Sequence, residues 1–178
     1  MKRKYNIAFT PINHREKFIE IANQFAQFAD EYLLGAKSNP HLTICQFLVD
    51  EKQIDKIWAE TCDSLQKKTI DLTFKEFTYT TYKDNIYYIS LIPENSVRLH
   101  EIHQLVASIV KEPLNLAYAE YDPHVTMINT HRTDCEKSIA EVASVSLPIQ
   151  DNFVLTLGTC DAGGQMSEII SLADKIIN

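Results

Sequence analysis

The chain has 178 residues, 45% of them apolar, with few glycines and prolines, which is the composition of one globular domain spanning residues 1–178. Its formal net charge is −7. We see no basic stripe, so the sequence disfavours an extended nucleic-acid-binding surface. No apolar run approaches the roughly 18 residues that span a bilayer, and the four cysteines lack CxxC spacing. We expect a monomeric, cytoplasmic protein without a membrane partner.

The first third of the chain predicts a strand and then a long helix. Residues 5–10 place Tyr5, Ile7 and Phe9 on one face, as a half-buried strand would. Asn13 and Glu16 resemble a capping box, so a helix is expected to begin there. Apolar residues at helical spacing extend this helix to Tyr32, and Gly35 ends it.

The middle of the chain predicts a strand, a helix and a hairpin. Residues 41–49 form the next expected strand, and Asp50 is the expected N-cap of the helix that follows. Residues 69–80 and 86–92 read as two hairpin strands. Their alternation changes phase near Glu76, which indicates a β-bulge.

The last part alternates in the same way. It predicts a helix over 96–111, a strand over 124–130 and a helix beginning near Thr133, then strands over 153–160 and 166–172. Strands and helices in this order, with a hairpin in the middle, predict an α+β fold with the helices packed outside the strands.

A short motif occurs twice. Residues 39–44 read NPHLTI and residues 122–127 read DPHVTM. Nine residues after the motif histidine come Asp50 in the first half and Thr133 in the second, each the expected cap of a helix. The two halves therefore suggest a divergent internal repeat with pseudo-two-fold symmetry.

The motif places an imidazole and a hydroxyl side by side. Side chains alternate along a strand, so His41 and Thr43 share one face while Leu42 and Ile44 point to the core. The same holds for the second motif, with His124 and Thr126 on one face. One neutral and one protonated histidine form an acid–base pair for phosphodiester chemistry, and threonine hydroxyls stabilise the phosphoryl oxygens. This chemistry requires no metal and no cofactor.

The paired motifs resemble those of the two-histidine (2H) phosphoesterase superfamily, which includes RNA 2′,5′-ligase-like proteins and cyclic nucleotide phosphodiesterases. The resemblance implies a bilobal α+β fold whose antiparallel sheets form a central groove. It implies His41 and His124 as catalytic residues, roughly 4 to 8 Å apart, and Thr43 and Thr126 as phosphate-binding residues. By analogy with cyclic phosphodiesterases, His124 is expected to be the base and His41 the acid. Some ligase-like members carry an arginine where this chain has Asn129.

Other residues near the motifs are weaker candidates. Phe9 and Tyr121, together with Tyr118, are candidate base-stacking residues. Cys45 is expected on the groove face with His41, as a small packed residue rather than a nucleophile. The remaining histidines are expected to be structural: His14, His100, His103 and His131.

Three functions compete at this point. The first is hydrolysis of 2′,3′-cyclic phosphates on nucleotides or RNA ends. The second is a non-catalytic module of the same fold that binds a nucleotide or RNA end. The third is a metal-dependent hydrolase with His41 and His124 as ligands, which the missing carboxylate partners disfavour. Activity that survives a chelator separates the first from the third.

Overall fold

A computed structural model of the chain describes residues 2–35, 37–83, 85–111, 113–114, 121–161 and 163–173. Within these ranges the strands are β1 (Lys2–Pro11), β2 (Leu42–Asp50), β3 (Thr69–Lys83), β4 (Ile86–Pro93), β5 (Val125–Thr130), β6 (Ile149–Cys160) and β7 (Met166–Leu172). The helices are α1 (Arg15–Asn23), the short 3₁₀-helix η1 (Ala26–Phe28), α2 (Glu51–Ser64), α3 (Val97–Val110) and α4 (Glu136–Ser146). Every helix in the described ranges is too short or too polar to cross a membrane.

The strands form one antiparallel sheet in the order β2-β1-β6-β3-β4-β5, and β7 also pairs with β6. The two strands that carry the motifs, β2 and β5, therefore stand at opposite ends of this order. They nevertheless contact each other, so the sheet must curve until its two ends approach. This arrangement is compatible with the expected two lobes and pseudo-two-fold symmetry, which stay predictions.

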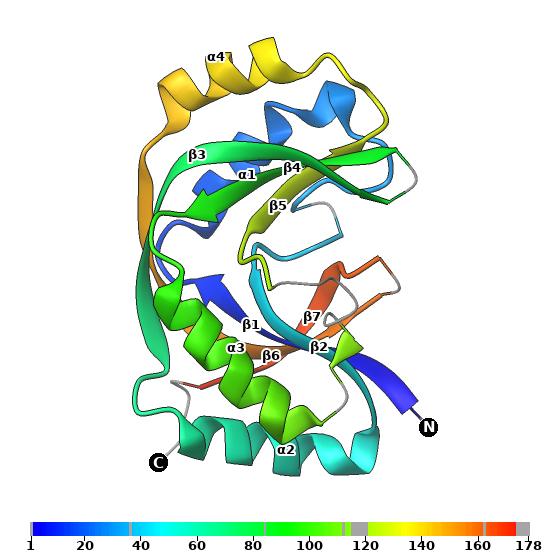
Figure 1. Cartoon of the computed structure of the whole chain (residues 1–178), viewed down its shortest axis with the longest axis vertical. Helices are drawn as coiled ribbons and strands as arrows, with labels where there is room; N and C mark the ends of the chain where they lie inside the picture. The colour runs from blue at the N-terminus through cyan, green and yellow to red at the C-terminus, as the bar shows by residue number, and fades with distance from the viewer. Residues whose placement is uncertain are drawn as a thin grey trace.

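The helices lie outside the strands (Figure 1). Helices α2 and α3 pack on each other and on β2 in the lower half of the view, whereas α1 packs on β5 and α4 on β3 in the upper half. The expected α+β arrangement with outer helices is confirmed. Each motif strand therefore contacts at least one helix and also contacts the other motif strand.

Strand β1 lies in the hydrophobic core. Tyr5, Ile7 and Phe9 are at most 1% exposed, but Asn6 and Ala8 are fully buried too. The expectation of a half-buried strand is therefore wrong, because both faces of β1 are covered. A buried aromatic cluster joins α1 to β3 and β6, because the ring of Phe18 meets Phe74 and Phe153 edge-on at centroid distances of 5.8 and 5.7 Å. The bulge predicted near Glu76 is confirmed by a register shift between Phe74 and Glu76.

The long first helix was a wrong expectation, since α1 ends at Asn23 and only η1 follows it. The reason lies in β5. Backbone bonds join Asp30 N–H to Asn129 O, Asn129 N–H to Tyr32 O, and Leu34 N–H to Met127 O. Residues 30–39, which we call the crossing segment, therefore begin extended along β5, where tertiary pairing overrides the helical period.

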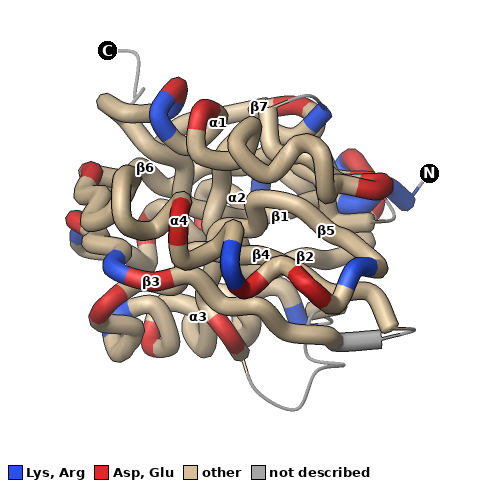
Figure 2. Tube along the Cα trace, turned by 90° about the horizontal axis from the view of Figure 1, so that it is seen from above, with Lys and Arg blue, Asp and Glu red and all other residues tan. Residues whose placement is uncertain are grey.

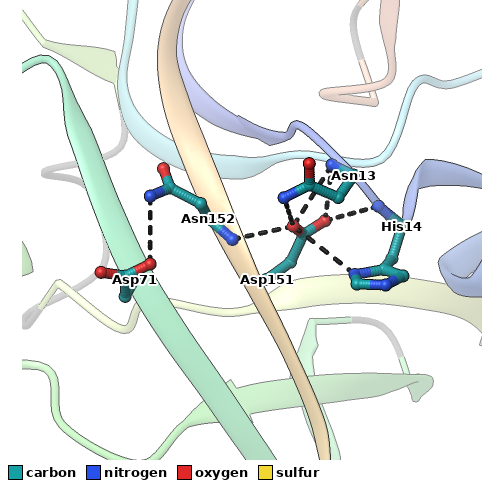
Figure 3. A network of polar contacts seen from close by, with 5 residues as sticks. All are labelled: Asn13, His14, Asp71, Asp151 and Asn152. Carbon is teal, nitrogen blue, oxygen red and sulfur yellow. Dashed lines mark hydrogen bonds and ion pairs between the residues drawn. The ribbon is translucent and has the colours of Figure 1, made fainter.

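Both predicted caps around α1 and α4 were also wrong, while Asp50 caps α2 by accepting a bond from Lys52 N–H. Helix α4 begins after Cys135, two residues beyond Thr133. At α1 the cap comes from β6, because the buried carboxylate of Asp151 accepts bonds from Asn13 N–H and His14 N–H (Figure 3). The side-chain amide of Asn13 also donates to Asp151, at 2.8 Å.

Candidate active site

The motif strands present their side chains as predicted. Leu42 and Ile44 on β2, like Val125 and Met127 on β5, are fully buried. The alternate positions hold the functional groups: His41 is 8% exposed, and Thr43, His124 and Thr126 are half-buried. The apolar half of each motif therefore fixes the strand in the core, and the polar half faces the other way.

Both motif histidines make the same type of hydrogen bond, from the ring to a backbone carbonyl two residues earlier. Nδ1 of His41 lies 2.7 Å from the carbonyl oxygen of Asn39, and Nδ1 of His124 lies 2.7 Å from the carbonyl oxygen of Asp122. A carbonyl oxygen only accepts, so Nδ1 carries the hydrogen in each ring. This assigns the tautomer, in which Nε2 of each ring is the nitrogen without a hydrogen in the neutral form.

The two imidazoles act on each other electrostatically. Burial lowers the pKa of His41 to about 4; the bond to Asn39 O opposes this fall, and the nearby His124 adds to it. Burial also lowers the pKa of His124, against the raising effects of the Asp122 charge and backbone bond. The rings thus lie within electrostatic reach of each other. Their separation of roughly 4 to 8 Å stays a prediction.

A bulge in β2 changes the environment of the first motif. Ala8 pairs with Thr43, but the next residue, Ile7, pairs with Cys45, which leaves Ile44 as the extra residue. The expectation that Cys45 shares the face of His41 is therefore wrong, because the bulge turns Cys45 into the core with Ile7. It is fully buried, and burial raises the pKa of its thiol to about 12.

His103 and Tyr121 brace this bulge from the side of α3. His103 donates its Nδ1–H to Ile44 O at 2.7 Å, and the Tyr121 hydroxyl donates to Thr43 O at 2.9 Å. The two rings stack with centroids 4.1 Å apart and planes 3° from parallel. Consecutive carbonyls of the motif are thus fixed by one stacked pair. We call His103 and Tyr121 the brace.

Each motif threonine has a buried polar neighbour on the adjacent strand. Asn6 on β1 donates its amide to the Thr43 hydroxyl oxygen at 3.0 Å, which leaves the hydroxyl hydrogen of Thr43 for a ligand. On the other side, Ser90 of β4 stands opposite Thr126 in the register and is 2% exposed. Sequence reasoning missed both neighbours. The one signal for Asn6 was its polar position in an otherwise apolar strand.

The crossing segment connects the two motifs. Asn129 Oδ1 accepts bonds from the backbone N–H groups of Glu31 and Tyr32, which anchors the segment on β5. At its other end Asn39 donates both its backbone N–H and its side-chain amide to Met166 O. His41 follows two residues later. Asn129, at the position where some ligase-like members carry arginine, is thus a structural residue that ties the first motif to the second.

The structure describes two of the three candidate base-stacking residues, Phe9 and Tyr121. Phe9 is fully buried, so no face of its ring is open to a base, and the structure contradicts that expectation. One face of Tyr121 is covered by His103, so its firm role is in the brace. Tyr118 lies outside the described residues.

The charges around the fold are mixed. Figure 2 shows Lys and Arg interspersed with Asp and Glu along the described trace rather than gathered in one stripe. In the same residues, no three His, Cys, Asp or Glu side chains come together in a way that holds a metal ion. The motifs supply two imidazoles that interact electrostatically and two half-buried hydroxyls, residue types suited to proton transfer and to binding an anionic group.

Comparisons with known proteins give a family and several similar structures. A family model described as the 2'-5' RNA ligase superfamily matches residues 11–153. Escherichia coli LigT complexed with 3'-AMP shares 14% identity at a TM-score of 0.59 over 96% of each chain. LigT complexed with NADP+ shares 12% at 0.56 over 97% of each chain. Kluyveromyces marxianus Usb1 shares 11% at 0.52 over 96% of each chain, and curated proteins give no significant match.

Proposed function

The chain belongs to the 2′-5′ RNA ligase superfamily, as its resemblance to the two-histidine phosphoesterases predicted, and on that premise we propose that it is a metal-independent phosphodiesterase. Its substrates are 2′,3′-cyclic phosphates of nucleotides or RNA ends. The observation that carries the proposal is the matched hydrogen bonding of His41 and His124, which fixes the same Nδ1–H tautomer in both rings of a repeated motif.

The two rings supply the proton transfers. One neutral imidazole takes a proton from the attacking water while the other, protonated, gives a proton to the departing ester oxygen. The hydroxyls of Thr43 and Thr126 donate to the non-bridging phosphoryl oxygens, where negative charge is held through the transition state. Asn6 supports this role, because its bond occupies the oxygen of Thr43 and not the hydrogen.

The proposed substrate is small. The mixed surface charge favours a nucleotide or the end of an RNA over a long duplex. Structures of LigT are described as complexes with 3'-AMP, NADP+ and ATP, and one of Usb1 as a complex with uridine monophosphate. These likenesses support a nucleotide ligand here. The monomeric state and the cytoplasmic location stay predictions from the sequence.

The test is a screen of 2′,3′-cyclic nucleotides, 2′,5′-linked dinucleotides and RNA ends with EDTA present. Turnover in EDTA is expected, and loss of all turnover on chelation would favour a metal-dependent hydrolase. His41→Ala and His124→Ala should each lose several powers of ten in kcat, and the double variant little more, because the pair acts as a unit. Thr43→Val and Thr126→Val should each raise the barrier by about 2–4 kcal/mol.

A matched control is His131→Ala. His131 directly follows the last residue of β5, but its ring is exposed and bonded to Asp30. Its replacement should leave kcat unchanged. Wild-type rates in both motif variants would refute the catalytic reading. A wild type that binds nucleotides and turns over no substrate would instead establish the alternative, a non-catalytic binding module.

A further inference from the structure

The two motif histidines are held alike but neighbour different side chains. In each half the carbonyl oxygen two residues before the histidine accepts the Nδ1–H bond. The residue that supplies this carbonyl is Asn39 in the first half and Asp122 in the second. The halves therefore share one geometry and differ by one negative charge.

The carboxylate of Asp122 lies beside the ring that its own backbone holds. Its Oδ2 is 3.7 Å from Nδ1 of His124. A negative charge at this distance favours the imidazolium form. Burial lowers the pKa of His124, and Asp122 opposes that fall through its charge and its backbone bond. His124 consequently keeps its proton to higher pH than burial alone would allow.

The amide of Asn39 has a different use. Its Nδ2 donates to Met166 O at 3.1 Å, and its Oδ1 accepts a bond from Arg15 at 3.2 Å. It adds no charge beside His41. The charged group that acts on His41 is His124 itself, whose positive form further lowers the pKa of His41. His41 is therefore neutral at neutral pH.

We propose that Asp122 is a positioning residue that makes His124 the general acid, and that the uncharged Asn39 leaves His41 as the general base. This inference rests on the proposed function and reverses the assignment expected from the cyclic phosphodiesterases. His41 Nε2 takes a proton as the water oxygen bonds to phosphorus. His124 gives its Nε2 proton to the ester oxygen as the P–O bond breaks. The products are a phosphomonoester and a free hydroxyl, and proton exchange with solvent restores both rings.

The first test follows the ring of His124 by NMR titration of the full chain, with no substrate present. Asp122→Asn removes the charge and keeps the backbone carbonyl, so His124 should lose its proton at lower pH, and His41 should change less because it feels Asp122 only through His124. Asp122→Glu should restore most of the shift. An unchanged His124 titration in Asp122→Asn overturns the inference, whether or not the protein is active.

The second test is kinetic. In Asp122→Asn the alkaline limb of kcat/KM should move to lower pH, with about a fivefold loss on that limb. This factor corresponds to about 1 kcal/mol, the interaction of two charges about 4 Å apart in a water-like medium. An unmoved limb contradicts the inference.

A substrate with an activated leaving group separates acid from base. In a p-nitrophenyl phosphodiester the leaving group, p-nitrophenolate, departs without being protonated. His124→Ala should therefore retain most of the wild-type activity on this substrate, whereas His41→Ala should not. The opposite pattern means that His41 is the acid and overturns the assignment. A wild type that hydrolyses none of the substrates refutes the proposed function, and the NMR result then still decides the role of Asp122.

Discussion

His103 lies outside both motifs, and its replacement tests how the site is held. His103→Leu keeps an apolar side chain in the buried space but removes the Nδ1–H donor to Ile44 O and the stacked ring on Tyr121. A buried carbonyl left without its donor costs about 1–3 kcal/mol, and the lost ring pair about 0.5–1.5 kcal/mol. We expect the free energy of unfolding to fall by about 3 kcal/mol. His103→Asn restores an N–H near the position of Nδ1 and should cost about 1 kcal/mol.

The loss of kcat in His103→Leu should not exceed the loss caused by removing the Thr43 hydroxyl. The bulge residue Ile44 directly follows Thr43, so a slip of its carbonyl moves the threonine hydroxyl. A displacement of about 1 Å costs about 10²-fold in rate, and removal of one hydroxyl donor costs about 2–4 kcal/mol. His103→Leu should therefore lower kcat by roughly 10- to 100-fold, with a smaller change in KM, and His103→Asn should recover most of this loss.

The assay is a double-mutant cycle with Thr43→Val, read both in kcat and in denaturant unfolding. If His103 acts through Thr43, His103→Leu should cost little further kcat in the Thr43→Val background, while its effect on unfolding stays the same. Additive losses in kcat would refute the brace as a positioning device and leave His103 a purely structural residue. Full activity of His103→Leu, with the stability loss present, would refute it as well.

Three further predictions concern the fold around the site. Folding lowers the pKa of His41 from 6.5 to about 4, so the unfolded chain binds more protons between these values. Unfolding free energy should then fall by up to about 3 kcal/mol as pH drops through that window, and denaturant titrations at pH 7 and 4.5 should show a smaller fall in His41→Asn. Asn129→Ala leaves two backbone donors of the crossing segment unpaired and should cost about 2–3 kcal/mol by the same measurement. Asp151→Asn should destabilise the chain by about 3 kcal/mol in thermal unfolding, because the buried carboxylate accepts several bonds around the start of α1, whereas the exposed control Asp71→Asn should cost less than 1 kcal/mol.

Local patterns predicted most of the fold. The strands, the bulge near Glu76 and the cap at Asp50 depend on residues a few positions apart, and periodicity records such relations directly. The extended course of residues 30–34 depends on Asn129, about a hundred positions away. The cap of α1 depends in the same way on Asp151. A single sequence shows the two residues of such a pair but not that they are in contact. The helical period therefore predicted a helix as far as Tyr32, whereas α1 ends at Asn23.

The site divides in the same manner. The repeat predicted the two histidines and two threonines, because each motif carries its own face alternation. The brace could not be predicted, since it joins the middle of α3 to a carbonyl of β2. The sequence shows that the first motif has Asn39 where the second has Asp122. The meaning of this difference required the structure, which shows that both residues hold their histidines by the same backbone bond.

The bulge at Ile44 explains why the first motif carries a thiol so close to its histidine without exposing it. In a regular strand Cys45 would follow His41 and Thr43 onto the polar face, next to the proposed phosphate site. The extra residue turns Cys45 into the core beside Ile7, where burial keeps it a neutral thiol. At the same irregularity the carbonyl of Ile44, the extra residue, accepts a bond from His103. One added residue thus turns the thiol away from the polar face and places next to Thr43 the carbonyl that His103 holds.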